Sequence, residues 1–150
     1  IMVFRKSDGM VGYFTPCAPR LENEMDAGYY ARVEARLRQA GTYKPGDQLV
    51  AIVEHTDLPQ HHGFRNAMTF DGTIKADMPK CREIQRERIR RARKPLLEAL
   101  DGEYIRALET ADVIKQAEVV AQKQALRDAP ANPAIDAAKT PDELKAVWPL

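Results

Sequence analysis

The sequence contains few cysteines and no long apolar run, and these two features exclude several classes of protein. The chain of 150 residues has two cysteines, Cys17 and Cys81, too few for a disulfide framework and not spaced like the ligands of a compact metal site. Its longest apolar run, Leu49 to Val53, has five residues, whereas a helix that spans a bilayer needs about 20. We therefore expect reduced thiols, no cofactor and no membrane contact.

The first residues also lack the features of an exported protein. The segment from Ile1 to Lys6 has neither the apolar core nor the small-residue cleavage site of a secretory signal, so we expect synthesis and folding in the cytoplasm. Hydrophobic residues make up 44% and charged residues 30%, which is ordinary for a folded domain and too apolar for a disordered chain.

Residues that carry catalysis are sparse as well. Ser7 is the only serine, neither cysteine has a recognised flanking signature, and no phosphate-binding lysine loop or dinucleotide fingerprint occurs. His55, His61 and His62 would suit zinc together with a thiolate, but their spacing matches no zinc motif, so a polar loop is the better interpretation. The sequence predicts neither an enzyme nor a metal site.

An α+β fold follows from a change of periodicity near Met78, and we expect a β-rich domain at 1–78 and a helical region at 79–150. In the first part, Asp8-Gly9 and Asp71-Gly72 tolerate the positive φ of tight turns, which predicts two β-hairpins. The strands of the first run from Met2 to Lys6 and Met10 to Thr15, and those of the second from Phe64 to Phe70 and Thr73 to Asp77.

One helix and one further strand are predicted between the hairpins. The helix covers 27–40 and ends at Gly41; its expected buried face comprises Tyr30, Val33, Leu37 and Ala40. After a turn at residues 44–47, the apolar run within residues 48–54 predicts a strand buried on both faces. We expect this strand to be central in a sheet of about four to six strands.

The helical region is predicted to begin at Pro79 and to form a helical hairpin. Pro95 predicts a kink or a break near Lys94, and Asp112 is a candidate N-cap for a second helix that ends at Arg127. Apolar residues recur at mostly three- and four-residue steps and form one helical stripe of Ile84, Ile89, Ala92, Leu96, Leu100, Tyr104, Leu108 and Ala111. We expect the stripe to be buried against protein, of this chain or of another copy, with Ile84, Ile89, Leu96, Leu100, Tyr104 and Leu108 as the protein-interaction residues.

The C-terminal segment carries a strong helix start. Pro130 and Pro133 end the preceding helices, and Thr140-Pro141-Asp142-Glu143 is a capping box with proline at the first helical position. Trp148 follows in the last turn. It either docks into a neighbouring subunit, as a protein-interaction residue, or packs back onto the helical hairpin of its own chain.

Charge is uneven although the formal net charge is +1. Residues 80–94 contain eight basic and two acidic side chains, and residues 95–150 contain six basic and ten acidic ones. A helix would align Arg82, Arg86, Arg90 and Arg93, a row that suits nucleic acid or an acidic partner. The alternative is a solvated or subunit-bridging face, because glutamates lie at helical spacing, no aromatic is interleaved, and the acidic C-terminal segment can cover the row.

Several runs of sequence occur in the order seen in a known group of proteins. They are Phe64-Arg65-Asn66-Ala67, Ala76-Asp77-Met78-Pro79-Lys80-Cys81-Arg82-Glu83-Ile84, Arg93-Lys94-Pro95-Leu96-Leu97, Lys123-Gln124-Ala125-Leu126-Arg127-Asp128 and Thr140-Pro141-Asp142-Glu143-Leu144-Lys145-Ala146-Val147-Trp148-Pro149. Over about residues 64–149 the chain resembles small tail-associated proteins of tailed bacteriophages and of prophages of proteobacteria. Residues 1–63 carry no such resemblance, so the β-rich half is expected to be the partner-specific part.

The resemblance implies a structural component of a virion, associated with the tail or a tail fibre, that binds other virion proteins. Virion parts are usually symmetric, so a homo-oligomer located in the virion tail is expected. Two alternatives stay open. One is a tail fibre assembly chaperone that leaves before maturation, since Gln124 to Asp128 is similar to the end of such chaperones; the other is a nucleic-acid-binding accessory protein.

Overall fold

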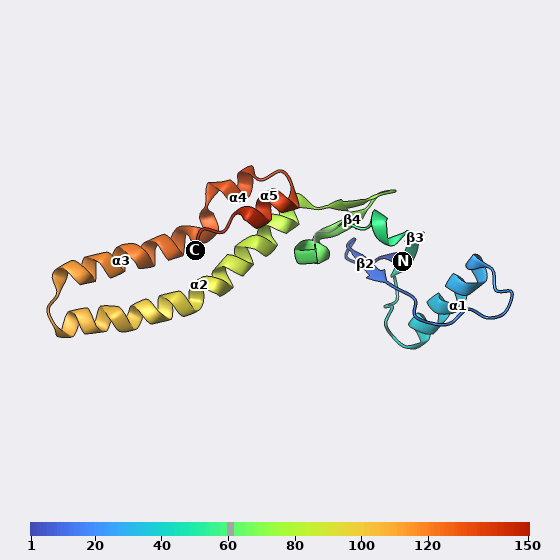
Figure 1. Ribbon diagram of the computed structural model, residues 1–150, viewed down its shortest axis with the longest axis horizontal. Helices are drawn as coiled ribbons and strands as arrows, with labels where there is room; N and C mark the ends of the chain where they lie inside the picture. The colour runs from blue at the N-terminus through green and yellow to red at the C-terminus, as the bar shows by residue number, and fades with distance from the viewer. Residues whose placement is uncertain (60–61) are drawn as a thin grey trace. The chain divides into compact units, whose positions relative to one another are not determined.

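The computed structural model describes residues 1–59 and 62–150, and the chain divides into two compact units (Figure 1). Unit 1 is Ile1–Asp77 and unit 2 is Met78–Leu150, so the division falls one residue before the predicted boundary. Unit 1 contains the strands and one α-helix, and unit 2 is helical. The α+β fold class predicted from the sequence is confirmed.

Unit 1 is built on a three-stranded antiparallel sheet. Strand β1 (Met2–Arg5) lies between β2 (Val11–Phe14) and β3 (Gln48–Ile52), so the first predicted hairpin is confirmed. The prediction that 48–54 is a central strand was wrong. Strand β3 is an edge strand and its apolar residues are half-buried at most, because a short apolar run looks the same whether one face or both are covered.

Helix α1 (Asp26–Gln39) supplies the other half of the core of unit 1. Tyr29, Val33 and Leu37 pack against Met2 and Phe4 of the sheet. Tyr30, also predicted on this face, is half-buried and packs against this core, whereas Ala40 is the exposed C-cap. Tyr29 can be buried because its hydroxyl donates to the carbonyl oxygen of Ala18 at 2.9 Å.

Gly41 ends α1 as predicted, with a φ of +69°. The amide of Gly41 donates to the carbonyl of Arg38 at 3.1 Å, and that of Thr42 donates to Leu37 at 3.0 Å. These two bonds form a Schellman motif, which needs a residue in the left-handed conformation. The glycine therefore has a conformational role, since no atom lies within 4 Å of the position that a Cβ would occupy.

Gly41→Ala is expected to destabilise unit 1 by about 1 kcal/mol, because an L side chain at this φ is strained. Gly28→Ala is the matched control. Gly28 lies inside α1 with φ in the ordinary range, and a Cβ there makes only a normal contact at 3.8 Å with Glu24. The control should stabilise unit 1 by about 0.5 to 1 kcal/mol. Urea denaturation of both variants should show opposite changes in the free energy of unfolding.

The second predicted hairpin is confirmed but shorter, and it forms a separate two-stranded sheet. Strands β4 (Met68–Phe70) and β5 (Ile74–Ala76) pair antiparallel, and a single bridge joins Met10 to Thr69. Two 3₁₀ helices precede them, η1 (His55–Asp57) and η2 (His62–Ala67). The prediction of a strand from Phe64 was wrong, because residues 62–67 form helical turns with a kink at Phe64, and the strand begins only at Met68.

An ion pair fixes the segment that leads into α1. Arg32 donates from Nε to Glu24 Oε1 at 2.7 Å and from Nη2 to Glu24 Oε2 at 2.5 Å. This bidentate contact lowers the pKa of Glu24 from 4.5 to about 2. Because the folded-state pKa is the lower one, the contribution to stability is present above pH 4.5 and is lost as the pH falls towards 2.

Carboxyl NMR titration is therefore expected to find Glu24 still ionised at pH 3, below the range in which an exposed glutamate protonates. In Arg32→Met the pKa of Glu24 should return towards its ordinary value. A pKa of Glu24 that Arg32→Met leaves unchanged would exclude the ion pair as its cause.

Unit 2 begins with the long helix α2 (Met78–Glu109), which contains Pro95. The helix is continuous, so the predicted break is absent, and it changes direction about halfway along (Figure 1). A bend of this kind is expected where an interior proline removes one backbone hydrogen bond. Pro95 therefore kinks α2 without ending it.

Helix α3 (Val113–Asp128) runs back along α2 and completes the predicted helical hairpin. Asp112 caps it as predicted, since its Oδ1 accepts from the amide of Lys115 at 2.9 Å. The chain turns through Ala111, whose φ is +54°. Ala111 was predicted on the apolar stripe, but it is an exposed turn residue outside α2.

The first half of α2 packs on the C-terminal segment, which holds η3 (Ala129–Ala131), α4 (Pro133–Ala137) and α5 (Pro141–Ala146). Thr140 caps α5 as predicted, but Glu143 accepts from the amide of Lys139. Helix α4 was missed because Pro133 was taken as a stop. Pro133 is instead the first helical residue, directly after the N-cap Asn132. Proline suits this position because its missing N–H is not needed there.

Candidate protein-interaction site

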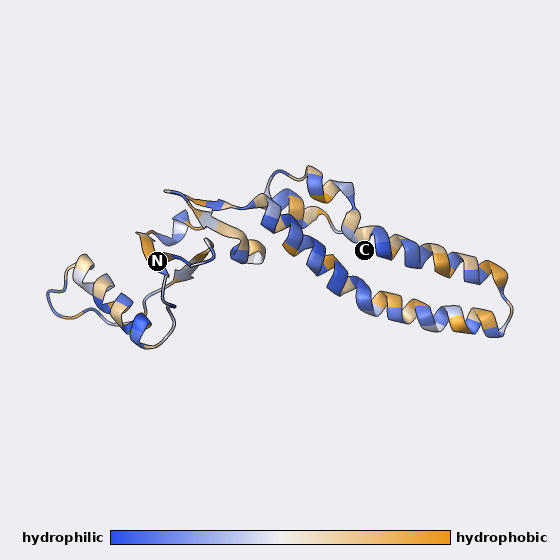
Figure 2. Cartoon of the chain, turned by 180° about the vertical axis from the view of Figure 1, so that it is seen from behind, coloured by the Kyte–Doolittle hydropathy of each residue, from blue (hydrophilic) through white to orange (hydrophobic). Residues whose placement is uncertain are grey.

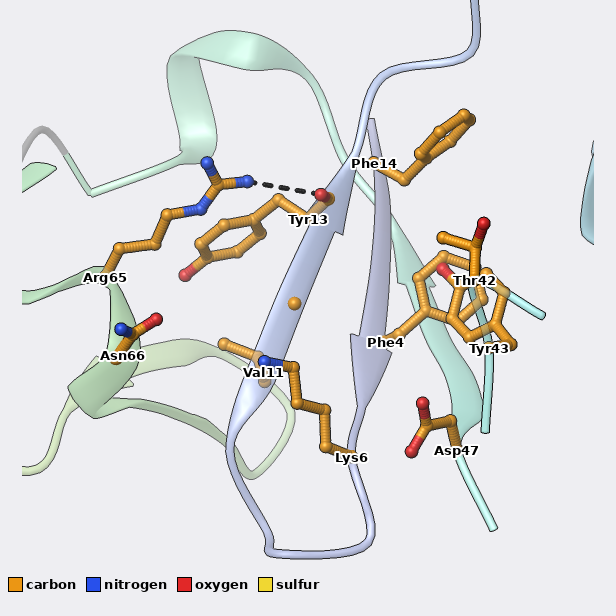
Figure 3. A pocket seen from close by; sticks show the side chains of 11 residues that line it. Phe4, Lys6, Val11, Tyr13, Phe14, Thr42, Tyr43, Asp47, Arg65 and Asn66 are labelled. Carbon is orange, nitrogen blue, oxygen red and sulfur yellow. Dashed lines mark hydrogen bonds between the residues drawn. The ribbon is translucent and has the colours of Figure 1, made fainter. Parts of the chain in front are cut away.

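A pocket of about 360 Å³ lies in unit 1, and none of its lining residues is a histidine, cysteine or serine (Figure 3). Arg65 stacks over the ring of Tyr13 and donates to the Tyr13 carbonyl oxygen at 3.2 Å. Burial raises the pKa of Tyr13. Asp47 accepts from the amides of Ser7 and Lys44, a structural role. The pocket holds no nucleophile with an adjacent base.

Thiols and histidines do not converge in the parts of the chain that the structure describes. Cys17 is exposed and Cys81 is buried in unit 2, and neither forms a disulfide. His55 lies in η1, whereas His61 is outside the described residues. Within 1–59 and 62–150 no group of three metal-ligating side chains occurs, and no helix combines the length and apolarity that crossing a bilayer requires.

The predicted arginine row contacts its own unit. Arg82 donates to the carbonyl of Ala138 at 2.9 Å, and Arg86 pairs with Asp136 at 2.5 Å. Arg93 Nη1 donates to the carbonyls of Leu126 and Arg127, at the C-terminal end of α3. Arg82 and Arg86 therefore hold the C-terminal segment against α2, and Arg93 holds the end of α3.

Arg90 is the exposed member of the row. It pairs with Glu83 at 2.9 Å and with Glu87 at 3.4 Å on its own helix. The hydrogen bond from Arg90 holds the pKa of Glu83 below its usual range. The glutamates at helical spacing thus neutralise Arg90, for which the structure shows ion pairs only within α2.

The predicted apolar stripe of α2 does not form one face. The buried side chains of the first half are Cys81, Gln85 and Ile89, so Ile89 is a core residue. Of the other residues predicted to bind protein, Ile84, Leu100 and Tyr104 are half-buried, and Leu96 and Leu108 are exposed. The stripe is unevenly buried because α2 packs on both α3 and the C-terminal segment, which cover different parts of it.

Trp148 does not pack back into a core, since its side chain is 48% exposed. The terminus is held instead by Leu144, which is fully buried, and by a hydrogen bond from Gln85 Nε2 to the carbonyl of Val147 at 2.9 Å. The first hypothesis for Trp148, an exposed aromatic that contacts another subunit, remains a prediction.

Helices α2 and α3 meet along a narrow seam. Ala107 and Val119 are buried, and Gln116 donates to the carbonyl of Ala107 at 3.2 Å. On one side of the seam Lys123 pairs with Asp101, and on the other Lys115 pairs with Glu103 at 3.7 Å. These two ion pairs define the two flanks of the hairpin.

The flank beside Asp101 and Lys123 is apolar. Leu108 lies two turns after Asp101 on α2, and Val120 lies three residues before Lys123 on α3, with Val113 two turns earlier. We call Leu108, Val113 and Val120 the apolar flank. Leu108 and Val120 are each 50% exposed and Val113 is 72% exposed, and Figure 2 shows apolar segments in both helices near their connecting turn.

The opposite flank is mostly polar, although the exposed Ile114 lies on this side, four residues before Glu118. It carries the pair of Glu103 and Lys115, and at helical spacing from them Arg106, Thr110 and Glu118. The hairpin is therefore amphipathic from side to side, with its apolar flank on the surface of unit 2. Sequence reasoning found Leu108 but missed Val113 and Val120, although their seven-residue separation on a helix was a usable signal.

No protein-family model, no curated protein and no solved structure matches this chain. The fold and the site together describe a chain with a β-rich unit and a helical hairpin unit, with an exposed apolar flank on the hairpin.

Proposed function

We propose that this chain is a structural component of a bacteriophage virion, associated with the tail or a tail fibre, that works through protein contacts and not through catalysis. The resemblance of residues 64–149 to tail-associated phage proteins supplies the setting. The observation that supports protein contact is the apolar flank of the hairpin. Apolar side chains gathered on one exposed flank indicate a surface that another protein covers.

The energetics support a contact through this flank. Fully burying a side chain such as valine or leucine contributes about 1.5 to 3 kcal/mol. Three such side chains lie exposed on two helices of one hairpin, and ion pairs and the buried seam hold those helices in place. A preorganised surface loses little conformational entropy on binding.

Quantitative mass spectrometry of purified particles tests this function. A structural component is expected at a fixed copy number relative to other tail proteins. The same measurement distinguishes a virion component from an assembly chaperone. A chaperone would be found with fibre subunits in infected-cell lysates but would be absent from mature particles. Absence from both fractions would overturn the virion role.

A nucleic-acid-binding role is the second candidate, and the arginines decide how it should be tested. Arg82, Arg86 and Arg93 bond within unit 2, so replacing them disturbs the fold as well as any binding. Arg90→Glu alters the row at an exposed position. Affinity for DNA that falls steeply with salt and is weakened by Arg90→Glu would favour this candidate.

A further inference from the structure

Three aspartates of this chain are followed directly by glycine, and an aspartate rearranges most readily in this setting. They are Asp8, Asp71 and Asp101. Glycine has no side chain to shield its amide nitrogen and its backbone turns easily, so that nitrogen can reach the carboxyl group of the preceding residue. Whether it does so in the folded chain depends on how the fold holds each pair.

Two of the three pairs are held in ways that oppose the reaction. Gly102 lies inside α2, where backbone amides are engaged in the hydrogen bonds of the helix and the backbone cannot rotate freely. Gly9 lies in the first hairpin turn, and its amide donates to the carbonyl of Lys6 at 2.9 Å. In both pairs the glycine amide therefore has to leave a hydrogen bond before it can react.

The pair of Asp71 and Gly72 differs, because it lies in the exposed turn between β4 and β5. No residue that the structure describes accepts a hydrogen bond from the Gly72 amide. Gly72 has a φ of +97°, and no atom lies within 4 Å of the position that a Cβ would occupy, so the turn is open to movement. The Asp71 carboxylate accepts from the amide of Thr73, two residues on, which holds it beside the intervening peptide.

We propose that Asp71 is a modification site, at which the folded chain converts spontaneously to isoaspartate. The Gly72 amide nitrogen attacks Cγ of the Asp71 carboxyl group and a C–N bond forms. The amide proton and the carboxyl hydroxyl leave as water, which gives a five-membered succinimide. Hydrolysis adds one water back, and opening at the main-chain carbonyl leaves the peptide link on the side chain. The mass of the chain is unchanged, and water is the only reactant.

Lys75 is placed to slow this reaction. Its ammonium pairs with the Asp71 carboxylate at 3.1 Å, and this hydrogen bond lowers the pKa of the Asp71 carboxyl group. Because the first step expels a hydroxyl group, the protonated carboxyl group is the form that reacts, and the ion pair keeps that form scarce. The product would add one atom to the main chain of the turn, next to the Phe70–Ile74 pair that closes the hairpin.

Peptide mapping with electron-based fragmentation tests the proposal, since it distinguishes isoaspartate from aspartate of equal mass. In the full chain aged at neutral pH, isoaspartate at Asp71 should exceed that at Asp8 or Asp101 by at least about 10-fold, because those two sites react only after local opening of the fold. Lys75→Met should raise the rate at Asp71 severalfold. Asp71→Glu is the control for the chemistry, since its ring would be six-membered, and it should give no rearranged product.

Aging in guanidinium chloride is the control for the fold. There the three pairs should react at similar rates, since the unfolded chain holds none of them. Equal amounts of isoaspartate at the three sites of the folded chain would overturn the proposal, as would an unchanged Asp71 in a folded chain whose unfolded form reacts at this position. A rate that Lys75→Met leaves unaltered would overturn the part assigned to Lys75. The reaction is independent of the proposed function, so either can fail without the other.

Discussion

Ile89→Ala is expected to lower the free energy of unfolding of unit 2 by about 2 to 5 kcal/mol. The Ile89 side chain is fully buried, on the face of α2 that also buries Cys81 and Gln85. Removing its outer atoms leaves a cavity that a rigid helix cannot close, so the cost exceeds the loss of apolar burial alone. Chemical denaturation followed by circular dichroism measures the change.

Leu108→Ala is the control, because the sequence gives Ile89 and Leu108 the same expected role. Leu108 is half exposed at the end of α2, so its truncation should change the stability of a single chain by less than about 1 kcal/mol. Equal destabilisation by the two variants would place Leu108 in the core and remove it from the apolar flank.

The second large effect is expected from Arg93→Met, at about 1.5 to 3 kcal/mol. The Arg93 guanidinium donates to the carbonyls of Leu126 and Arg127, which have no partners within α3 because the helix ends there. Methionine keeps most of the apolar stem and removes the charged donors. The variant should therefore lose the link between α2 and the end of α3, measured as a lower midpoint in urea.

Arg91→Met supplies the comparison for Arg93. Arg91 is exposed on the same helix two residues earlier, and its replacement should leave the midpoint almost unchanged. If the two variants are equally stable, the hydrogen bonds of Arg93 contribute nothing measurable. The arginine row would then have to be regarded as a solvated face.

Local sequence signals predicted much of this fold because each depends on a few adjacent residues. Asp8-Gly9 and Asp71-Gly72 specified two hairpins, Gly41 specified the end of α1, and Asp112 and Thr140 specified helix starts. In each case a backbone conformation or a short hydrogen bond selects the residue type. Tertiary context changes such signals little.

The errors came from features that depend on distant parts of the chain. Whether 48–54 is central or at an edge depends on which strands lie beside it, and the run of apolar residues does not record that. The predicted stripe on α2 is unevenly buried because the helix packs on two partners, the C-terminal segment and α3. Periodicity alone treats α2 as one straight helix.

The sequence predicted only part of the candidate interaction site, because the rest also depends on contacts between distant residues. The amphipathic character of α2 and α3 is visible in the sequence, but which apolar residues fill the internal seam depends on how the two helices pair. Val113 and Val120 became candidates once the ion pairs of Asp101 and Glu103 fixed the two flanks. Ile89, in contrast, is fully buried and cannot bind another protein, because the C-terminal segment covers its face of α2.

Carbene footprinting of Val113 and Ile114 compares the two flanks within one molecule. In a dilute sample of the isolated chain both side chains should be labelled strongly, since they are 72% and 76% exposed. In purified particles, Val113 and Val120 should be labelled far less than Ile114 if the apolar flank is the surface that binds protein. Equal labelling of the two flanks in the particle would contradict the role assigned to this hairpin.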